Sequence, residues 1–159
     1  MDTLVIFYSL SGRTHYEAKR IAELENAERY EVYERPPRSL LNAYLSGTIQ
    51  ARKHKTVGVE PIAVRPGDYD RVIIMCPVWG GAPAPAFNTI LSEIEAGQHV
   101  EILLTASSGK IRKPEALKKY VESKGSVVDR LEVIKTIDLK KRDRNREKRM
   151  KEAEKNGSV

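Results

Sequence analysis

The sequence has little of several residue types, and each shortage excludes a class of protein. Cysteine occurs once in 159 residues, as Cys76, so the chain cannot form an internal disulfide. Its three histidines are scattered rather than clustered as a zinc or iron–sulfur site requires. No apolar run approaches the roughly 18 to 20 residues of a membrane-spanning helix. We therefore expect a cytoplasmic protein with no metal site and, at this length, a single core.

Positive charge is concentrated at the C-terminus. The net charge is +6, and residues 138–159 hold nine Lys/Arg and five Asp/Glu, a net of +4. The run KKRDRNREKR has no apolar stripe with which to pack on a core. We therefore expect a basic, charged helix or a disordered tail over 138–159, beyond a domain of residues 1–137. An acidic redox partner would suit this charge; nucleic acid is the weaker alternative, because no aromatic residues interleave with the cations.

Strand-like and helix-like segments alternate through the domain. Apolar runs predict strands over 3–8, 71–76 and 100–105, and segments of mixed polarity predict strands over 30–34 and 127–137. Apolar residues at helical spacing predict a helix after each of the first four strands, on Ala18, Ile21 and Ala22; on Leu40, Leu41, Tyr44, Leu45 and Ile49; on Phe87, Ile90, Leu91 and Ile94; and on Leu117, Tyr120 and Val121.

This alternation favours parallel strands joined by right-handed crossovers, hence an α/β three-layer sandwich. The apolar strands suit the centre of a sheet and the two mixed ones suit its edges, so the predicted order is 2-1-3-4-5. Ligands of such sheets bind at the carboxyl ends of the strands, near the switch between strands one and three. The loops that begin at Ser9, Pro77 and Ala106 are therefore the candidate site.

The first of these loops is S-L-S-G-R-T. Its hydroxyls, its glycine and the N-terminus of the following helix predict a site for a phosphomonoester, and Arg13 could add a cation. The alternative is that Ser and Thr only cap the helix. The loop has neither GxxxxGK[ST] nor GxGxxG, so it predicts neither ATP nor NAD here.

The second loop contains Trp79, the only tryptophan, between Pro77 and the pair Gly80-Gly81. An aromatic plane beside a phosphate site predicts a planar cofactor. The alternative is that Trp79 covers the core. The glycines favour the cofactor, because they allow the backbone to approach ring heteroatoms closely.

Together, YSLSGRT, PVWGGAPAP and TASSGK resemble the flavodoxins, small proteins that bind flavin mononucleotide (FMN). The resemblance spans residues 3–137 and implies a flavodoxin-like electron-transfer protein with FMN as its redox group. It places the phosphate loop on Ser9, Leu10, Ser11, Gly12, Arg13 and Thr14, the first isoalloxazine loop on Pro77, Val78, Trp79, Gly80 and Gly81, and the second on Ala106, Ser107, Ser108 and Gly109.

Several departures from the family pattern leave alternatives open. The second flavin loop lacks the stacking Tyr of many flavodoxins, which leaves room for a nicotinamide or a quinone and so for an FMN-dependent NAD(P)H oxidoreductase. Lys110, Arg112 and Lys113 follow Gly109 and either raise the potential of the flavin or are simply solvated. An apolar final helix is missing, so a partner subunit could cover that face of the sheet. No catalytic residue is predicted, and Cys76 is interpreted as a core side chain.

Overall fold

A computed structural model describes residues 1–136 and 139–156. Its sheet has the order β2-β1-β3-β5-β6, with all neighbours on this path parallel. A two-residue strand, β4, lies off the path and pairs antiparallel with β3. Without β4 the order is the predicted 2-1-3-4-5, which is confirmed. The strands are β1 (Thr3–Tyr8), β2 (Glu28–Val32), β3 (Arg71–Trp79), β4 (Ala82–Pro83), β5 (His99–Ala106) and β6 (Val127–Lys135).

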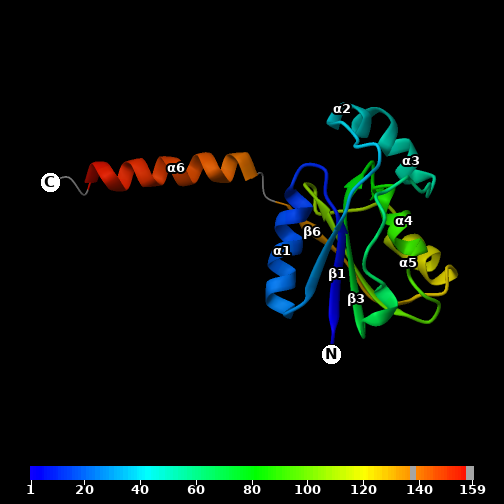
Figure 1. The fold of residues 1–159 in the computed structure, drawn as a ribbon. Helices are drawn as coiled ribbons and strands as arrows, with labels where there is room; N and C mark the ends of the chain where they lie inside the picture. The colour runs from blue at the N-terminus through cyan, green and yellow to red at the C-terminus, as the bar shows by residue number, and fades with distance from the viewer. Residues whose placement is uncertain (137–138, 157–159) are drawn as a thin grey trace.

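Helices cover both faces of the sheet, as a three-layer sandwich requires (Figure 1). Helix α1 (Arg13–Glu25) packs on one face through Ala18 and Ala22. Helices α4 (Ala86–Ser92) and α5 (Pro114–Ser123) pack on the other. Alternate residues of each central strand are buried in one layer or the other, and this explains why these strands are apolar throughout.

The third strand is longer than predicted. It continues to Trp79 and turns back through Gly80 and Gly81 into β4, where we expected an open loop from Pro77 onward. Strand β2 was predicted over 30–34, and in the structure both of its ends lie two residues earlier. Ile137, the predicted end of the last strand, lies outside the described residues.

The helical segment after β2 exists, but two of the residues predicted for its buried face, Leu41 and Ile49, are exposed. It comprises α2 (Leu40–Asn42), a π-helical stretch η1 (Ala43–Gly47) and α3 (Thr48–Arg52). Leu41 and Ile49 are exposed, whereas Ala43, Gly47 and Ala51 are buried. The π-helical stretch has a longer hydrogen-bond repeat than an α-helix, so it rotates the register on which the prediction rested. The predictions for the side chains of Leu40, Tyr44 and Leu45 lie outside what the structure describes.

Beyond α1, the same face of the sheet is polar. Arg71 pairs with Glu25 and with Glu101, and Arg130 pairs with Glu101 and with Glu132. These ion pairs lie on the part of the sheet that an apolar final helix, as in the flavodoxin pattern, would cover, and such a helix would pack on apolar side chains. Its absence therefore exposes charged groups rather than core, and coverage by a partner subunit stays a prediction.

The basic segment forms a single helix, α6 (Leu139–Asn156), in the described part of the tail. It extends away from the sheet in Figure 1, and its described side chains are exposed. Of the two alternatives for this segment, the structure has the solvated helix. None of the helices in 1–136 and 139–156 has both the length and the apolar character needed to cross a membrane.

Candidate functional site

The predicted loops enclose a cavity of about 780 Å³ at the carboxyl edge of the sheet. We call it the neutral cavity, because no ionisable side chain is among the residues found to line it. The first loop contributes two lining residues, the second four and the third one; the helical segment 40–52 contributes the others. They are Leu10 and Ser11; Pro77, Val78, Trp79 and Gly80; Ser107; and Ala43, Thr48 and Ile49.

The remaining predicted residues are not among those that line this cavity. Ala106 is buried at the end of β5, and the Ser108 hydroxyl bonds to the backbone of Lys110. Gly109 has φ 70 and lies against the Lys135 side chain. Ser9, Gly12, Arg13, Thr14 and Gly81 also lie outside the lining of this cavity.

The first loop leads into α1 without a side-chain cap, so the capping alternative fails. Gly12 has φ 88, a conformation that favours glycine, and the Ser9 hydroxyl accepts its N–H at 3.2 Å. The Thr14 hydroxyl lies 2.7 Å from that of Thr105, in the buried layer. Of the three hydroxyls in this loop, Ser11 is the one exposed to the neutral cavity. Arg13 is the first residue of α1, and the N–H groups of this first turn have no partner within the helix.

Gly80 and Gly81 form a tight hairpin turn between β3 and β4. Their φ values are 58 and 84, positive at both central positions as in a type I′ turn. A Cβ on Gly80 would lie 2.2 Å from Thr48 Cγ2. Both carbonyls are engaged, because Arg52 Nε donates to Gly80 O at 2.9 Å and the Arg112 backbone N–H donates to Gly81 O at 2.8 Å.

The Trp79 ring packs against the core and also lines the neutral cavity, so the packing interpretation is correct in part and the contact with a planar cofactor stays a prediction. Its ring meets that of Tyr8 edge-on, with 6.0 Å between centroids. The Arg38 guanidinium lies 5.6 Å from its centroid. A Cβ on Gly47 would stand 2.8 Å from the ring, so glycine is what lets the helical segment approach.

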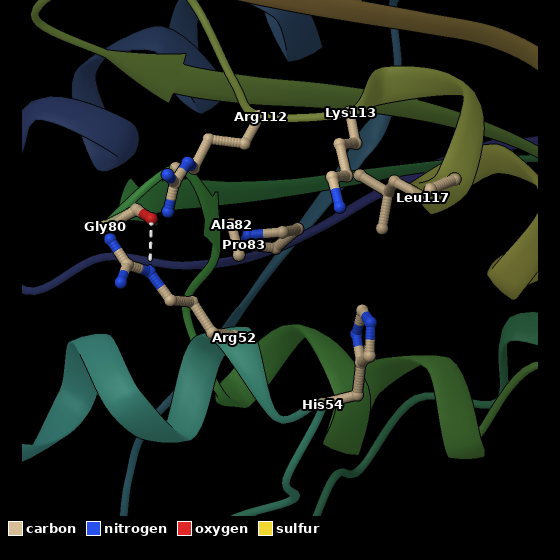
Figure 2. Close-up of a pocket in the computed structure, with 10 residues that line it drawn as sticks. Arg52, His54, Gly80, Ala82, Pro83, Arg112, Lys113 and Leu117 are labelled. Atoms are coloured by element: carbon tan, nitrogen blue, oxygen red, sulfur yellow. Dashed lines mark hydrogen bonds between the residues drawn. The ribbon is translucent and has the colours of Figure 1, made fainter.

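A second cavity, of about 380 Å³, lies beside the glycine turn (Figure 2). We call it the basic cavity, because Arg52, His54, Arg112 and Lys113 line it and no acidic residue is among its lining residues. Burial and the nearby Lys124 lower the pKa of His54. Its apolar and glycine lining residues are Gly80, Gly81, Ala82, Pro83, Ala116 and Leu117.

This arrangement divides the cations that follow Gly109. Arg112 and Lys113 line the basic cavity together with Arg52 and His54, whereas Lys110 is not among its lining residues. From the sequence, these three cations were predicted either to lie near a flavin or to be solvated, and no role was predicted for Arg52 or His54.

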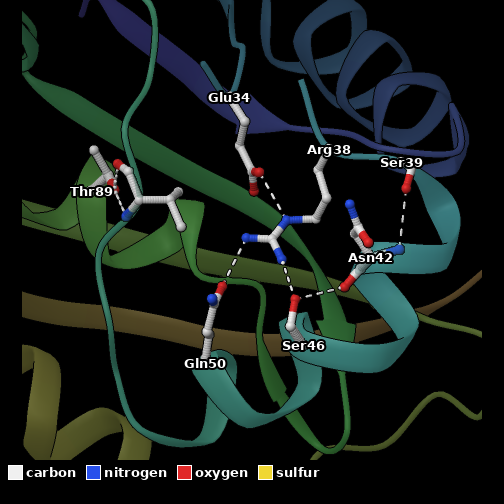
Figure 3. Close-up of polar contacts among 8 residues, drawn as sticks. Glu34, Arg38, Ser39, Asn42, Ser46, Gln50 and Thr89 are labelled. Atoms are coloured by element: carbon white, nitrogen blue, oxygen red, sulfur yellow. Dashed lines mark hydrogen bonds and ion pairs between the residues drawn. The ribbon is translucent and has the colours of Figure 1, made fainter. Parts of the chain in front are cut away.

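Arg38 links the end of β2 to the helical segment (Figure 3). Its Nε donates to Glu34 at 2.8 Å and its Nη2 to Gln50 at 2.8 Å, and a longer bond of 3.4 Å reaches Ser46. The Arg38 and Glu34 side chains are only 10% and 6% exposed. The contact therefore fixes the segment that walls both cavities.

Cys76 is a core residue, as predicted. It is fully buried, and burial raises the pKa of its thiol. In 1–136 and 139–156, no three metal-ligating side chains stand close enough to hold an ion.

Sequence reasoning missed the contribution of the helical segment to the neutral cavity, through Ala43, Thr48 and Ile49. The available signal was Gly47, because a glycine within a helical pattern often marks the close approach of another element.

No protein-family model matches the sequence, and no curated protein matches it. Solved structures do match the fold. A protein from Bacteroides eggerthii shares 18% identity over 87% of this chain and 91% of its own, with a TM-score of 0.71. A Lactobacillus acidophilus flavoprotein solved in complex with FMN shares 23% identity over 83% of this chain and 92% of its own, with a TM-score of 0.64. Two-electron reduced flavodoxin from Megasphaera elsdenii shares 13% identity over 87% of this chain and 89% of its own, with a TM-score of 0.53. The chain thus has the flavodoxin-like fold.

Proposed function

We propose that this chain, with its flavodoxin-like fold, binds FMN in the neutral cavity and serves as an electron-transfer protein. The observation that carries the proposal is that the exposed Ser11 hydroxyl and the Trp79 ring line one cavity, with the uncapped start of α1 two residues beyond Ser11 in the chain. Its volume of about 780 Å³ is within the usual range for small-molecule sites.

The residues present fit both ends of such a cofactor. A phosphate dianion would be held by backbone N–H groups at the start of α1 and by the Ser11 hydroxyl, because a helix N-terminus carries partial positive charge. The planar ring would be held by Trp79 and by the apolar residues Leu10, Val78 and Ile49. When bound, the flavin supplies one-electron or two-electron redox chemistry.

The polypeptide contributes orientation. The Trp79 ring already contacts the Arg38 guanidinium and Gly47. Its orientation is therefore fixed before a ligand binds, which lowers the entropy cost of binding. The Gly80–Gly81 turn is fixed by its two carbonyl hydrogen bonds. Any rotation of this turn in response to a ligand would have to break at least one of them.

The comparisons support the proposal at the level of the fold. One of the similar structures contains FMN, and another is a flavodoxin. At these identities the case for this chain depends on the chemistry of its own cavity.

Titration of the apoprotein with FMN and with riboflavin tests the proposal. We expect FMN to bind with quenching of its fluorescence, and riboflavin to bind at least about tenfold more weakly because it lacks the phosphate. Equal affinity would overturn the role of the first loop. Neither quenching nor heat with FMN would overturn the proposed function.

A reductase is the second candidate function. It is favoured by Ser107, because the third loop gives the neutral cavity a small hydroxyl where a second aromatic ring could have covered the ligand. A nicotinamide or a quinone could then reach the flavin. Anaerobic mixing with NAD(P)H distinguishes the two: a reductase loses its flavin absorbance directly, and a carrier does so only through a partner protein.

Helix α6 would favour an acidic redox partner protein, since its described side chains are exposed and rich in Lys and Arg. A chain that lacks residues 140–159 should accept electrons from such a partner more slowly at low salt. If the full chain is instead retained on DNA or RNA in a salt-dependent way and the shortened chain is not, α6 binds nucleic acid.

A further inference from the structure

The basic cavity is a second candidate site that shares a wall with the first. Gly80 lines both cavities, and Gly81 lines the basic one. A molecule in the basic cavity would therefore lie across the hairpin turn from the proposed cofactor. Figure 2 shows Arg52 approaching this space from α3 and Arg112 from the opposite side, beyond the turn.

The basic side chains of this cavity have no carboxylate partner in the part of the chain that the structure describes. Within 1–136 and 139–156, no ion pair involves Arg52, His54, Arg112 or Lys113. Other arginines of the domain are neutralised, for example those that pair with Glu34 or with Glu101. The like charges of Arg52, Arg112 and Lys113 around one cavity repel one another, so an anion there would be stabilised by all three.

Contacts with the glycine turn and a fixed backbone position the residues that carry these charges. The Arg112 backbone N–H donates to Gly81 O at 2.8 Å. The Arg112 side chain lies against Gly81, because a Cβ added to Gly81 would be 2.2 Å from Arg112 Cγ. Lys113 precedes α5 with φ 50, an uncommon conformation for a residue with a side chain. Arg52 is fixed by its bond to Gly80 O. The fold therefore brings these cationic residues to one cavity.

The remaining lining is apolar. Pro83 and Leu117 are buried in the floor, and Ala82 and Ala116 complete it. Guanidinium groups match the planar geometry of phosphate and carboxylate, while the floor suits a carbon skeleton. The volume of about 380 Å³ is too small for a macromolecule and is within the range of small-molecule sites.

We propose that the basic cavity binds a small organic polyanion, which carries phosphate or carboxylate groups on a partly apolar body. The polyanion would lie beside Gly80. If it carries a reduced nicotinamide, as NADPH does, it would pass a hydride to a flavin in the neutral cavity, and the nicotinamide would leave oxidised. That redox role rests on the proposed function, whereas the binding itself does not.

Calorimetric titration at constant ionic strength tests the proposal. The probes are NADPH, citrate and inorganic pyrophosphate, added to the full chain with its FMN content measured by absorbance. We expect saturable binding of NADPH or citrate, weakened about tenfold or more by Arg112→Gln and by Lys113→Gln, because each removes a charge-assisted hydrogen bond. The matched control Lys119→Gln, an exposed charge on α5, should leave the affinity unchanged.

The probes distinguish the two sources of negative charge. Binding of NADPH alone identifies a nucleotide phosphate, and binding of citrate alone identifies a polycarboxylate. Competition by pyrophosphate confirms that the acid groups are what the cavity recognises. The proposal is overturned if neither NADPH nor citrate binds, or if either binds equally to the wild type and to an R112Q/K113Q double variant.

The FMN content separates this proposal from the proposed function. Bound FMN with no polyanion binding overturns the basic cavity as a site and leaves the neutral cavity as proposed. If the chain does not take up FMN but binds the polyanion in a way that depends on Arg112, the proposed function is overturned and the basic cavity stands as a site.

Discussion

The two cavities meet at Gly80 and differ in how each could attract a negative group. The neutral cavity offers a Ser11 hydroxyl and an indole, and its proposed phosphate site is the backbone N–H groups at the start of α1, which follows Ser11 in the chain. The basic cavity offers side-chain cations on an apolar floor. Backbone donors are fixed by the fold and suit a group that stays bound, whereas long cationic side chains adapt to groups that come and go. The contrast thus agrees with a resident cofactor in one cavity and an exchanging ligand in the other.

Loss of the Arg38 side chain should loosen a wall of both cavities and lower the stability of the protein. Arg38→Met removes the buried partner of Glu34 and the bond to Gln50, so the helical segment that walls both cavities loses its anchor. Leaving a buried carboxylate unpaired typically costs about 3–5 kcal/mol, and we expect a fall of that order in the free energy of unfolding. Urea denaturation followed by circular dichroism measures it.

The matched control is Arg65→Met, which breaks an exposed pair with Glu95 at 3.7 Å. Exposed pairs contribute about 0–1 kcal/mol. If the two variants lose the same stability, the Arg38 contact does not anchor the segment.

Gly80→Ala should damage the wall that the cavities share. The φ of 58 costs a residue with a Cβ about 1 kcal/mol, and the added carbon would stand 2.2 Å from Thr48 Cγ2. We expect a loss of about 2 kcal/mol in unfolding free energy, together with weaker FMN binding, because Thr48 must move into the neutral cavity.

Two variants isolate the cause. Gly97→Ala carries a similar φ of 83 with nothing within 4 Å of the new Cβ, so it reports the backbone cost alone. Adding Thr48→Ser to Gly80→Ala deletes the crowded Cγ2 and should restore part of the loss. No restoration would show that crowding by Thr48 is unimportant.

Trp79→Ala should separate the cavities rather than damage both. Trp79 lines the neutral cavity only. Loss of ring stacking, about 1 kcal/mol beyond the area buried, predicts FMN binding about tenfold weaker or worse, with the affinity of the basic cavity for polyanions retained. Fluorescence titration with FMN and calorimetry with NADPH measure the two. Trp79→Phe should recover much of the FMN affinity; if the alanine variant binds FMN normally, Trp79 has only its packing role.

The sequence predicts the fold well because hydrophobic period and edge polarity are local properties of the chain. The five parallel strands and their order follow from which runs are apolar throughout. The helical segment 40–52 was misjudged because a π-helical stretch rotates its face, and a large exposed residue such as Leu41 looks like a core residue in a periodic pattern. The hairpin after Trp79 was missed because a glycine pair in a Pro-rich stretch fits an open loop equally well.

For the site, the difference between the cavities also sets what could be predicted. The neutral cavity is built largely from three motifs, each contiguous in sequence, so a resemblance can reveal them. The basic cavity joins Arg52 and His54 to Arg112 and Lys113, nearly sixty residues further along the chain. Neither pair is a motif, and only the packing of α3 beside the glycine turn and the start of α5 brings them together.

The smallest effect we predict is on the pH dependence of the basic cavity. Burial and Lys124 lower the pKa of His54, while Arg52 and Lys113 also line its cavity and Tyr120 stacks on its ring at 4.0 Å. Without a ligand, a lowered pKa means that the unfolded chain binds the proton more readily, so the His54 contribution to stability falls as the pH falls below the usual histidine range. A bound polyanion reverses this preference, because it stabilises the protonated ring. Polyanion affinity should therefore rise about threefold from about pH 8 to about pH 5, while the Lys and Arg side chains stay charged. In a His54→Gln variant the rise should disappear at nearly unchanged affinity at the higher pH; if the rise persists, it belongs to the titration of the ligand itself.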